Sequence, residues 1–213
     1  MKTALIAGGT GLIGSALIRL LLDSPRYREV KAITRRDLEM KDPNLKPLFI
    51  DYRTLEQSRA DLQADDVFCC LGTTMAKAKS KEKFREVDYS FPLALAQTSV
   101  VSGAKQFLLV SSLGADKDAR IFYNRVKGET EEAISRIGFN CVHIFRPSLL
   151  LGPRPEARSA EDAAKLFYRI FGFLMPDKYK AIEASRVASA MLHFAGLEQK
   201  GTFIHESKEM QNL

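Results

Sequence analysis

Short apolar runs alternate with amphipathic stretches along the first 150 residues of the chain. The runs are apolar throughout rather than at every second position, which is typical of strands covered on both faces. Amphipathic stretches of helical length lie at 12–22, 83–102 and 121–137. This alternation predicts an α/β fold, a doubly wound parallel sheet with right-handed crossovers. The predicted strands lie at 3–8, 30–34, 47–50, 67–72, 107–112 and 141–145.

The rhythm changes after residue 147. Residues 148–180 contain three prolines and the aromatic segment LFYRIFGFLM, and a helix-like and a strand-like stretch follow. No linker or internal repeat divides the chain, so we expect one domain over 1–213, with 148–200 as a small C-terminal lobe on the substrate side. The aromatic segment is interpreted as plain core or as a pocket lining, with these candidates: Leu166, Phe167, Ile170, Phe171, Phe173 and Leu174.

Composition and charge disfavour several classes of protein. No apolar stretch reaches the roughly 18 residues of a membrane span, and no secretion signal opens the chain. Cys69, Cys70 and Cys141 lie inside apolar runs at spacings that fit neither disulfides nor a zinc site, so we expect buried thiols in a reducing cytoplasm and no metal. The net charge of +6 is spread along the chain without a nucleic-acid-binding motif, which indicates a solvated basic surface and no nucleic-acid partner.

Residues 7–14, AGGTGLIG, place glycines directly after the first predicted strand. Gly8, Gly11 and Gly14 match a spacing that permits a tight turn, close approach of backbone to a pyrophosphate, and close helix packing. The amides at the start of the following helix can then bind phosphate. A tight turn without a ligand is the alternative, which the clean amphipathic helix disfavours. The predicted dinucleotide-binding residues here are Gly8, Thr10, Gly11, Leu12, Ile13 and Gly14.

The end of the second predicted strand bears on which nucleotide binds. An acid at this point usually holds the ribose 2′-hydroxyl of NAD, whereas a 2′-phosphate favours guanidinium groups, which bind phosphate oxygens in pairs. The sequence here is AITRRD, with Arg35 and Arg36 where the acid would stand. We therefore predict NADP(H) as the preferred cofactor, with NAD(H) as the alternative. Ordinary surface charge is the other interpretation of the two arginines.

Two further strand ends contribute candidates to the same cleft. Asp51 follows the third strand and is interpreted equally as an acceptor for an adenine amino group or as a turn residue. Leu71, Gly72 and Thr73 follow the fourth strand. Gly72 would let the backbone approach the cofactor, and Thr73 offers a hydroxyl.

Candidate catalytic residues come from the fifth strand and the helix after it. Tyr123 and Lys127 are four residues apart and therefore share a helix face. A phenol is a poor base at neutral pH, and a nearby cation lowers the pKa of such a group toward the working range. Ser111 and Ser112 end the fifth strand near the start of that helix. A serine hydroxyl there can hold a substrate carbonyl while the tyrosine supplies the proton.

This ordered set of motifs resembles the short-chain dehydrogenase/reductase superfamily, whose NAD(P)-binding domain is a Rossmann fold. GGTGLIGSALI, TRR, FCCLGTT, LLVSSLGAD, YNRVKGE and FRPSLLLG are similar, more narrowly, to its atypical branch, which contains the Tat-interacting oxidoreductase. The resemblance implies NADP(H) across the sheet, with the nicotinamide near Tyr123 and Lys127 on the ribose. It also implies that Arg146 and Pro147 close the nicotinamide side and that Ser112 is the catalytic serine.

The sequence departs from the family pattern at Asp88. Many members carry an asparagine at the comparable position of the long central helix, where it anchors a water in a proton relay. The region after Arg146 is also short, so the resemblance implies a small or open substrate pocket.

Three functions follow from these residues. The leading hypothesis is an NADP(H)-dependent reductase of a small carbonyl, or dehydrogenase of the alcohol, with Ser112, Tyr123 and Lys127 as catalytic residues. An NADPH-sensing regulatory protein is an alternative, which the retained catalytic set disfavours. A sugar-nucleotide epimerase or dehydratase is another, but it needs a larger second lobe. Pairing of the helices at 83–102 and 121–137 into a homodimer is left open against a monomer.

Overall fold

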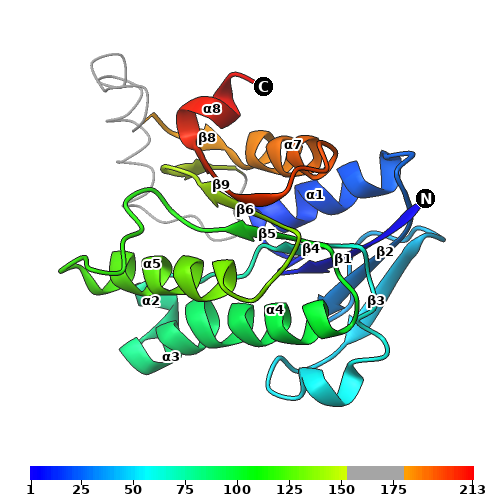
Figure 1. Ribbon diagram of the computed structural model, residues 1–213, viewed down its shortest axis with the longest axis horizontal. Coiled ribbons are helices and arrows are strands. Elements are labelled where there is room, and N and C mark those ends of the chain that lie inside the picture. Colours follow the sequence, from blue (N-terminus) through cyan, green and yellow to red (C-terminus); the bar gives the residue numbers. More distant parts are fainter. Residues whose placement is uncertain (153–179) are drawn as a thin grey trace.

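A parallel sheet forms the centre of the computed structural model, which describes residues 1–152 and 180–213 (Figure 1). Seven strands pair in the order β3-β2-β1-β4-β5-β6-β9. The order reverses direction between β1 and β4, so the doubly wound Rossmann fold predicted from the sequence is confirmed. The strands are β1 Lys2–Ala7, β2 Tyr27–Thr34, β3 Leu45–Phe49, β4 Asp66–Cys69, β5 Gln106–Val110, β6 Cys141–Arg146 and β9 Gly201–Glu206.

Helices cover both faces of this sheet (Figure 1). Along β1, Ala4 and Ile6 point into the core beneath α1 and α7, while Leu5 and Ala7 point into the core beneath α4 and α5. Burial on both faces explains why the strands are apolar throughout. The helices are α1 Leu12–Asp23, α2 Met75–Ala78, α3 Lys81–Arg85, α4 Phe91–Val101, α5 Phe122–Ser135, α7 Ala184–Ala195 and α8 Ser207–Gln211. A 3-10 turn, η1, lies at Leu55–Ser58, and a π turn, η2, lies at Glu86–Ser90. Two further strands, β7 Leu150–Leu151 and β8 Ile182–Glu183, pair with each other in a small second sheet.

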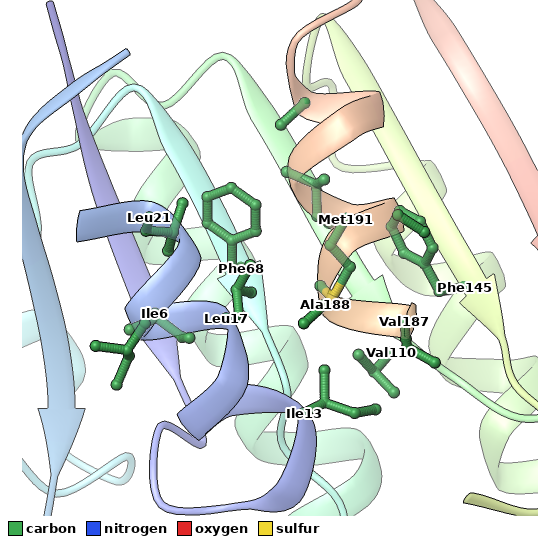
Figure 2. Close-up of a cluster of buried hydrophobic side chains, with 14 of the residues drawn as sticks. Ile6, Ile13, Leu17, Leu21, Phe68, Val110, Phe145, Val187, Ala188 and Met191 are labelled. Carbon is green, nitrogen blue, oxygen red and sulfur yellow. The ribbon is translucent and has the colours of Figure 1, made fainter. Parts of the chain in front are cut away.

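The helix α7 packs beside α1 on the sheet. Figure 2 shows Leu17 of α1 beside Phe68 of β4, and Met191 of α7 between that ring and Phe145 of β6. All four side chains are fully buried, and each contributes roughly 1.5–3 kcal/mol by leaving water. The two helices therefore share one continuous core.

The lobe expected at 148–200 is described only in part. Its helical stretch is α7, which belongs to the main layers, and the strand that follows, β9, pairs in parallel with β6 at the edge of the main sheet. The described part of the expected lobe thus contains one helix that covers the main sheet and the separate two-stranded ladder of β7 and β8. The pocket candidates in the aromatic segment lie outside the described residues.

The helix expected over 83–102 is present as one helical run from Lys81 to Val101, with a π turn inside it. Pro92 has no N–H to donate to the carbonyl of Asp88 four residues earlier, and its ring crowds that carbonyl. The helix widens there into the π turn η2, and Thr130 Oγ1 of α5 lies within hydrogen-bond distance of both Asp88 O, at 2.9 Å, and Val126 O, at 2.8 Å. The predicted helix is therefore confirmed, with a π turn between its two α-helical parts, α3 and α4.

The cysteines are unpaired in this fold. Cys69 and Cys141 are buried as predicted, whereas Cys70 is half-buried, because it leaves the sheet at the end of β4. Among residues 1–152 and 180–213, no helix has the length and apolar character needed to cross a bilayer.

Candidate active site

The predicted site residues lie along one edge of the sheet. The strands run parallel, so the loops that follow them leave from the same edge, at which doubly wound sheets bind ligands beside the reversal of strand order. The reversal lies between β1 and β4, which are followed by the two glycine-containing loops. In the order of the strands across the sheet, from β3 through β2, β1, β4 and β5 to β6, the predicted residues that follow them are Asp51, Arg35, Gly8, Gly72, Ser111 and Pro147.

The loop after β1 leaves no room for side chains at two of its glycines. Gly8 has a φ of +82°, and a Cβ there would lie 2.5 Å from Cys70 O. A Cβ at Gly14 would lie 2.2 Å from Gly8 O, so α1 packs directly on the turn. Gly11 precedes α1, and no side chain caps the amides at the start of this helix. The loop therefore forms a cradle with free amide donors, which fits a pyrophosphate.

The other predicted residues of this loop differ in what they expose. Thr10 is exposed, Leu12 is half-buried, and Ile13 is buried in the core beneath α1. Ile13 can therefore offer a ligand its backbone but not its side chain.

Both arginines after β2 are exposed. Neither guanidinium forms an ion pair with any residue of the described part of the chain. Thr34 Oγ1 accepts a hydrogen bond from Arg36 N at 3.2 Å, which fixes the turn that carries the pair. The two cations are thus available to an anion at this end of the edge.

Asp51 already has partners within its own turn. Its Oδ1 accepts a hydrogen bond from Arg53 N at 3.0 Å, and its Oδ2 lies 3.6 Å from the guanidinium of the same arginine. These contacts favour the turn interpretation of Asp51 over the adenine interpretation.

Ser111 and Ser112 are both buried but have opposite surroundings. Ser111 Oγ donates to the carboxylate of Glu131 on α5 in a short hydrogen bond. Ser112 Oγ has no hydrogen-bond partner among the described residues. Its hydroxyl is therefore the one left for a ligand.

Glu131 ties α5 to the ends of two strands. Arg146 donates to it twice, from Nε at 3.1 Å and from Nη2 at 2.5 Å, and these hydrogen bonds raise the pKa of the Arg146 guanidinium. The side chain of Arg146 thus supports the site from behind, while Pro147 O accepts from Leu113 N at 2.9 Å. Glu131 was not predicted from the sequence, although it lies four residues after Lys127 on the same helix face.

Lys127 is buried against Asp88. Its Nζ lies 2.8 Å from Asp88 Oδ1 in a buried ion pair. Burial is the largest influence and acts to lower the pKa of Lys127, but Asp88, Tyr123 and Cys69 together outweigh it, so the pKa is raised. Lys127 is therefore a cation at neutral pH, with its counter-ion inside the fold.

Tyr123 lies one helical turn before Lys127. Its ring is half-buried and tilts against Phe84, with ring centres 5.3 Å apart. Its hydroxyl forms no hydrogen bond with any residue of 1–152 or 180–213. The fold thus brings Tyr123 and Lys127 onto one face of α5. The loop after Ser112 is bonded to the same helix, because Asp116 N donates a hydrogen bond to Asn124 O at 3.1 Å.

The sequence of this chain matches a known protein family and several of its relatives. The model of the NAD dependent epimerase/dehydratase family matches residues 4–170. The protein HTATIP2 of Rattus norvegicus is 35% identical over 199 residues, which are 90% of this chain and 80% of that protein. The protein FMP52, mitochondrial, of Candida albicans is 32% identical over 92% of this chain and 87% of its own.

Solved structures share the fold at low identity. The Bordetella bronchiseptica enzyme WbmH, in complex with NAD+, superposes with a TM-score of 0.74 at 19% identity, over 97% of this chain and 76% of that one. MoeE5, in complex with UDP-glucose and NAD, gives 0.73 at 18% identity, over 98% and 79%. These two likenesses support the Rossmann architecture.

The relatives also correct one prediction and confirm another. FMP52 proteins of Candida albicans, Emericella nidulans and Lodderomyces elongisporus, 31–32% identical to the chain, are named as mitochondrial, which contradicts the predicted cytoplasmic location. Unpaired cysteines indicate a reducing compartment without saying which one, so that prediction was wrong. The motif resemblance is confirmed: the chain belongs to the NAD dependent epimerase/dehydratase family, within the atypical short-chain dehydrogenase/reductase branch that includes HTATIP2.

Proposed function

We propose that the protein is an NADP(H)-dependent oxidoreductase that interconverts a small carbonyl compound and its alcohol. The observation that carries this proposal is the buried, unpartnered hydroxyl of Ser112 at the end of β5. Leaving such a group without a hydrogen bond costs about 1–3 kcal/mol. A carbonyl oxygen of a substrate would satisfy it.

The residues around Ser112 supply the rest of the chemistry. The cofactor, when bound, supplies the hydride. Ser112 donates a hydrogen bond to the carbonyl oxygen and polarises it, and the free hydroxyl of Tyr123 gives that oxygen its proton. Lys127 is a buried cation whose donors suit the ribose hydroxyls. The cradle of Gly8 and Gly14 fits the pyrophosphate.

The preference for NADP(H) rests on Arg35 and Arg36. Both guanidinium groups are exposed and unpaired among the described residues, at the strand end where an acid would hold the ribose of NAD. The 2′-phosphate of NADP(H) would give both guanidinium groups an anionic partner, because each guanidinium can donate a pair of hydrogen bonds to phosphate oxygens.

Cofactor preference is tested by binding. In the double variant Arg35→Ala/Arg36→Ala, NADPH affinity should fall at least tenfold, about 1.4 kcal/mol, and NADH affinity should stay within a factor of two. Arg19→Ala/Arg28→Ala, which removes two exposed arginines elsewhere, is the matched control. Titration followed by nicotinamide fluorescence measures both, and equal weakening of the two cofactors would contradict the 2′-phosphate argument.

Proton donation is tested by turnover. Tyr123→Phe should reduce the turnover of any carbonyl found in a substrate panel by about 10²–10⁴-fold and leave cofactor affinity nearly intact. Tyr89→Phe, which removes another half-buried phenol hydroxyl, should leave turnover unchanged. Turnover that survives in Tyr123→Phe would remove its role, and cofactor binding without turnover of any carbonyl would favour the sensor hypothesis.

A further inference from the structure

Asp88 connects the loop after β4 to the catalytic face of α5. Its side chain is buried, and Oδ2 accepts a hydrogen bond from Thr73 N at 2.9 Å. Oδ1 lies 2.8 Å from Lys127 Nζ. A Cβ at Gly72 would lie 3.4 Å from Asp88 Oδ1 and 3.6 Å from Lys127 Nζ. The ion pair therefore lies directly beneath the exposed backbone of Gly72, on the side of the predicted cofactor.

Asp88 is itself held firmly. Its carboxylate accepts the amide of Thr73, and its backbone is part of the helical run from Lys81 to Val101, so both ends of the residue are fixed. The lysine side chain, by contrast, has four rotatable bonds and no other ion pair with residues 1–152 or 180–213. A buried ammonium without a counter-ion would be strongly disfavoured. The position of the Lys127 ammonium is thus set by Asp88.

We propose that Asp88 is a positioning residue that holds the Lys127 ammonium beneath Gly72, where it binds the ribose of the nicotinamide half of the cofactor. The proposal rests on the proposed function and extends it to a residue that differs from the usual asparagine of the family. An amide could still accept from Thr73 N but could not pair with the ammonium. Asp88 therefore acts through its charge, on one half of the dinucleotide.

The geometry separates this role from that of an ordinary buried ion pair. Asp66 is also buried and pairs with Lys2 at 3.3 Å, but it begins β4, at the opposite edge of the sheet. The pair of Asp88 lies at the carboxyl edge, one helical turn from Tyr123. Loss of either carboxylate should lower stability, whereas only loss of Asp88 should change cofactor binding.

The experiment compares a whole dinucleotide with its adenosine half in the full-length protein. Calorimetry measures the affinity of NADPH and of adenosine 2′,5′-bisphosphate, which lacks the nicotinamide ribose, for wild type and Asp88→Asn. We expect NADPH to bind about tenfold more weakly to the variant and the bisphosphate to bind equally well. Asp66→Asn should change neither affinity. If the protein prefers NADH, then NADH and ADP replace the two ligands.

A double-mutant cycle tests whether Asp88 acts through Lys127. In a Lys127→Met background, Asp88→Asn should cause no further loss of NADPH affinity, because the group that it positions is gone. Additive losses would overturn the proposal, as would an unchanged NADPH affinity in Asp88→Asn. If Asp88→Asn does not fold, Asp88→Ser, which also removes the charge and keeps an acceptor, replaces it. Wild-type protein that binds neither dinucleotide would instead overturn the proposed function, and this proposal with it.

Discussion

Two neighbouring serines at the end of β5 show how burial alone fails to define a role. Ser111 is part of a hydrogen-bonded group with Glu131 and Arg146, which fixes the strand against α5. Ser112 is equally buried, yet nothing in the described part of the chain accepts or donates to its hydroxyl. The first hydroxyl therefore belongs to the fold, and the second is the one that we propose binds the substrate.

Alanine substitution should separate these two roles. Ser111→Ala removes a donor from a buried carboxylate and should lower the free energy of unfolding by about 1–3 kcal/mol. Ser112→Ala removes an unpaired hydroxyl, so it should leave stability unchanged or slightly higher while reducing turnover by about 10²–10³-fold. Urea unfolding and carbonyl turnover measure the two effects. The assignment would be reversed if Ser111→Ala lost turnover at full stability.

The sequence could identify these serines only as a pair. Their position at a strand end followed from the apolar run before them, and the choice of Ser112 came from family resemblance. The reason for that choice lies in Glu131 and Arg146, which meet only when α5 packs on β6. Such partners depend on the packing of separate elements, which periodicity does not describe.

At the scale of elements, the π turn between α3 and α4 shapes the site. Pro92 leaves the carbonyl of Asp88 without the amide donor four residues later, and the Thr130 hydroxyl of the neighbouring helix can donate to this carbonyl or to Val126 O. The π turn therefore packs against α5 at the level of Lys127. Pro92 was visible in the sequence, but the apolar pattern on both sides of it still favoured one helix, because a π turn changes that pattern by a single residue.

A second double-mutant cycle tests this role of Pro92 at the π turn. Thr130→Val removes the hydroxyl that can donate to Asp88 O or to Val126 O, and it should cost about 1–2 kcal/mol of unfolding free energy. In a Pro92→Ala background the cost should be smaller, because the backbone N–H of residue 92 can then donate to the same carbonyl. Urea unfolding of the four proteins measures the coupling. An equal cost of Thr130→Val in both backgrounds would show that the proline does not control this carbonyl.

At the scale of the whole molecule, a chain of polar groups that includes two buried histidines joins the last strands of the sheet. His143 Nδ1 of β6 lies 3.0 Å from His205 Nε2 of β9, and His205 Nδ1 lies 3.1 Å from Glu209 Oε2 of α8. If His205 Nδ1–H donates to Glu209, then His205 Nε2 must accept the proton of His143 Nδ1–H. His143 Nε2 then accepts the thiol proton of Cys141, whose sulfur lies 3.2 Å away. This arrangement requires both imidazoles to be neutral.

A fall in pH should therefore lower the free energy of unfolding. Burial, with repulsion from His205, lowers the pKa of His143 to about 4 from its ordinary value of 6.5. The unfolded chain therefore binds a proton at His143 more readily than the folded chain does. The contribution of this difference to the free energy of unfolding is fully present above pH 6.5 and is lost as the pH falls from 6.5 toward 4. His143→Phe should reduce this dependence of the urea midpoint on pH. His193→Gln, at an exposed histidine, should leave it unchanged, and an equal slope in all three proteins would contradict the assignment.

The overall fold was more predictable than the site because each strand and glycine turn is encoded locally. Periodicity could not show that α7 joins α1 in one core, since this contact links segments more than 160 residues apart. The same limit applies to the cofactor edge. Its residues were found from strand ends, whereas the partners that hold them came from other elements.

The π turn at Glu86–Ser90 also constrains how this chain can change during evolution. A π turn holds one residue more than the α-helical turn that it replaces. Deleting one residue there would rotate the helix on one side by about 100° relative to the other. Either Phe84 and Asp88 would lose their contacts with α5, or Leu95 and Ala96 would lose their packing against the sheet. We therefore expect single-residue deletions at this turn to be tolerated less well than substitutions.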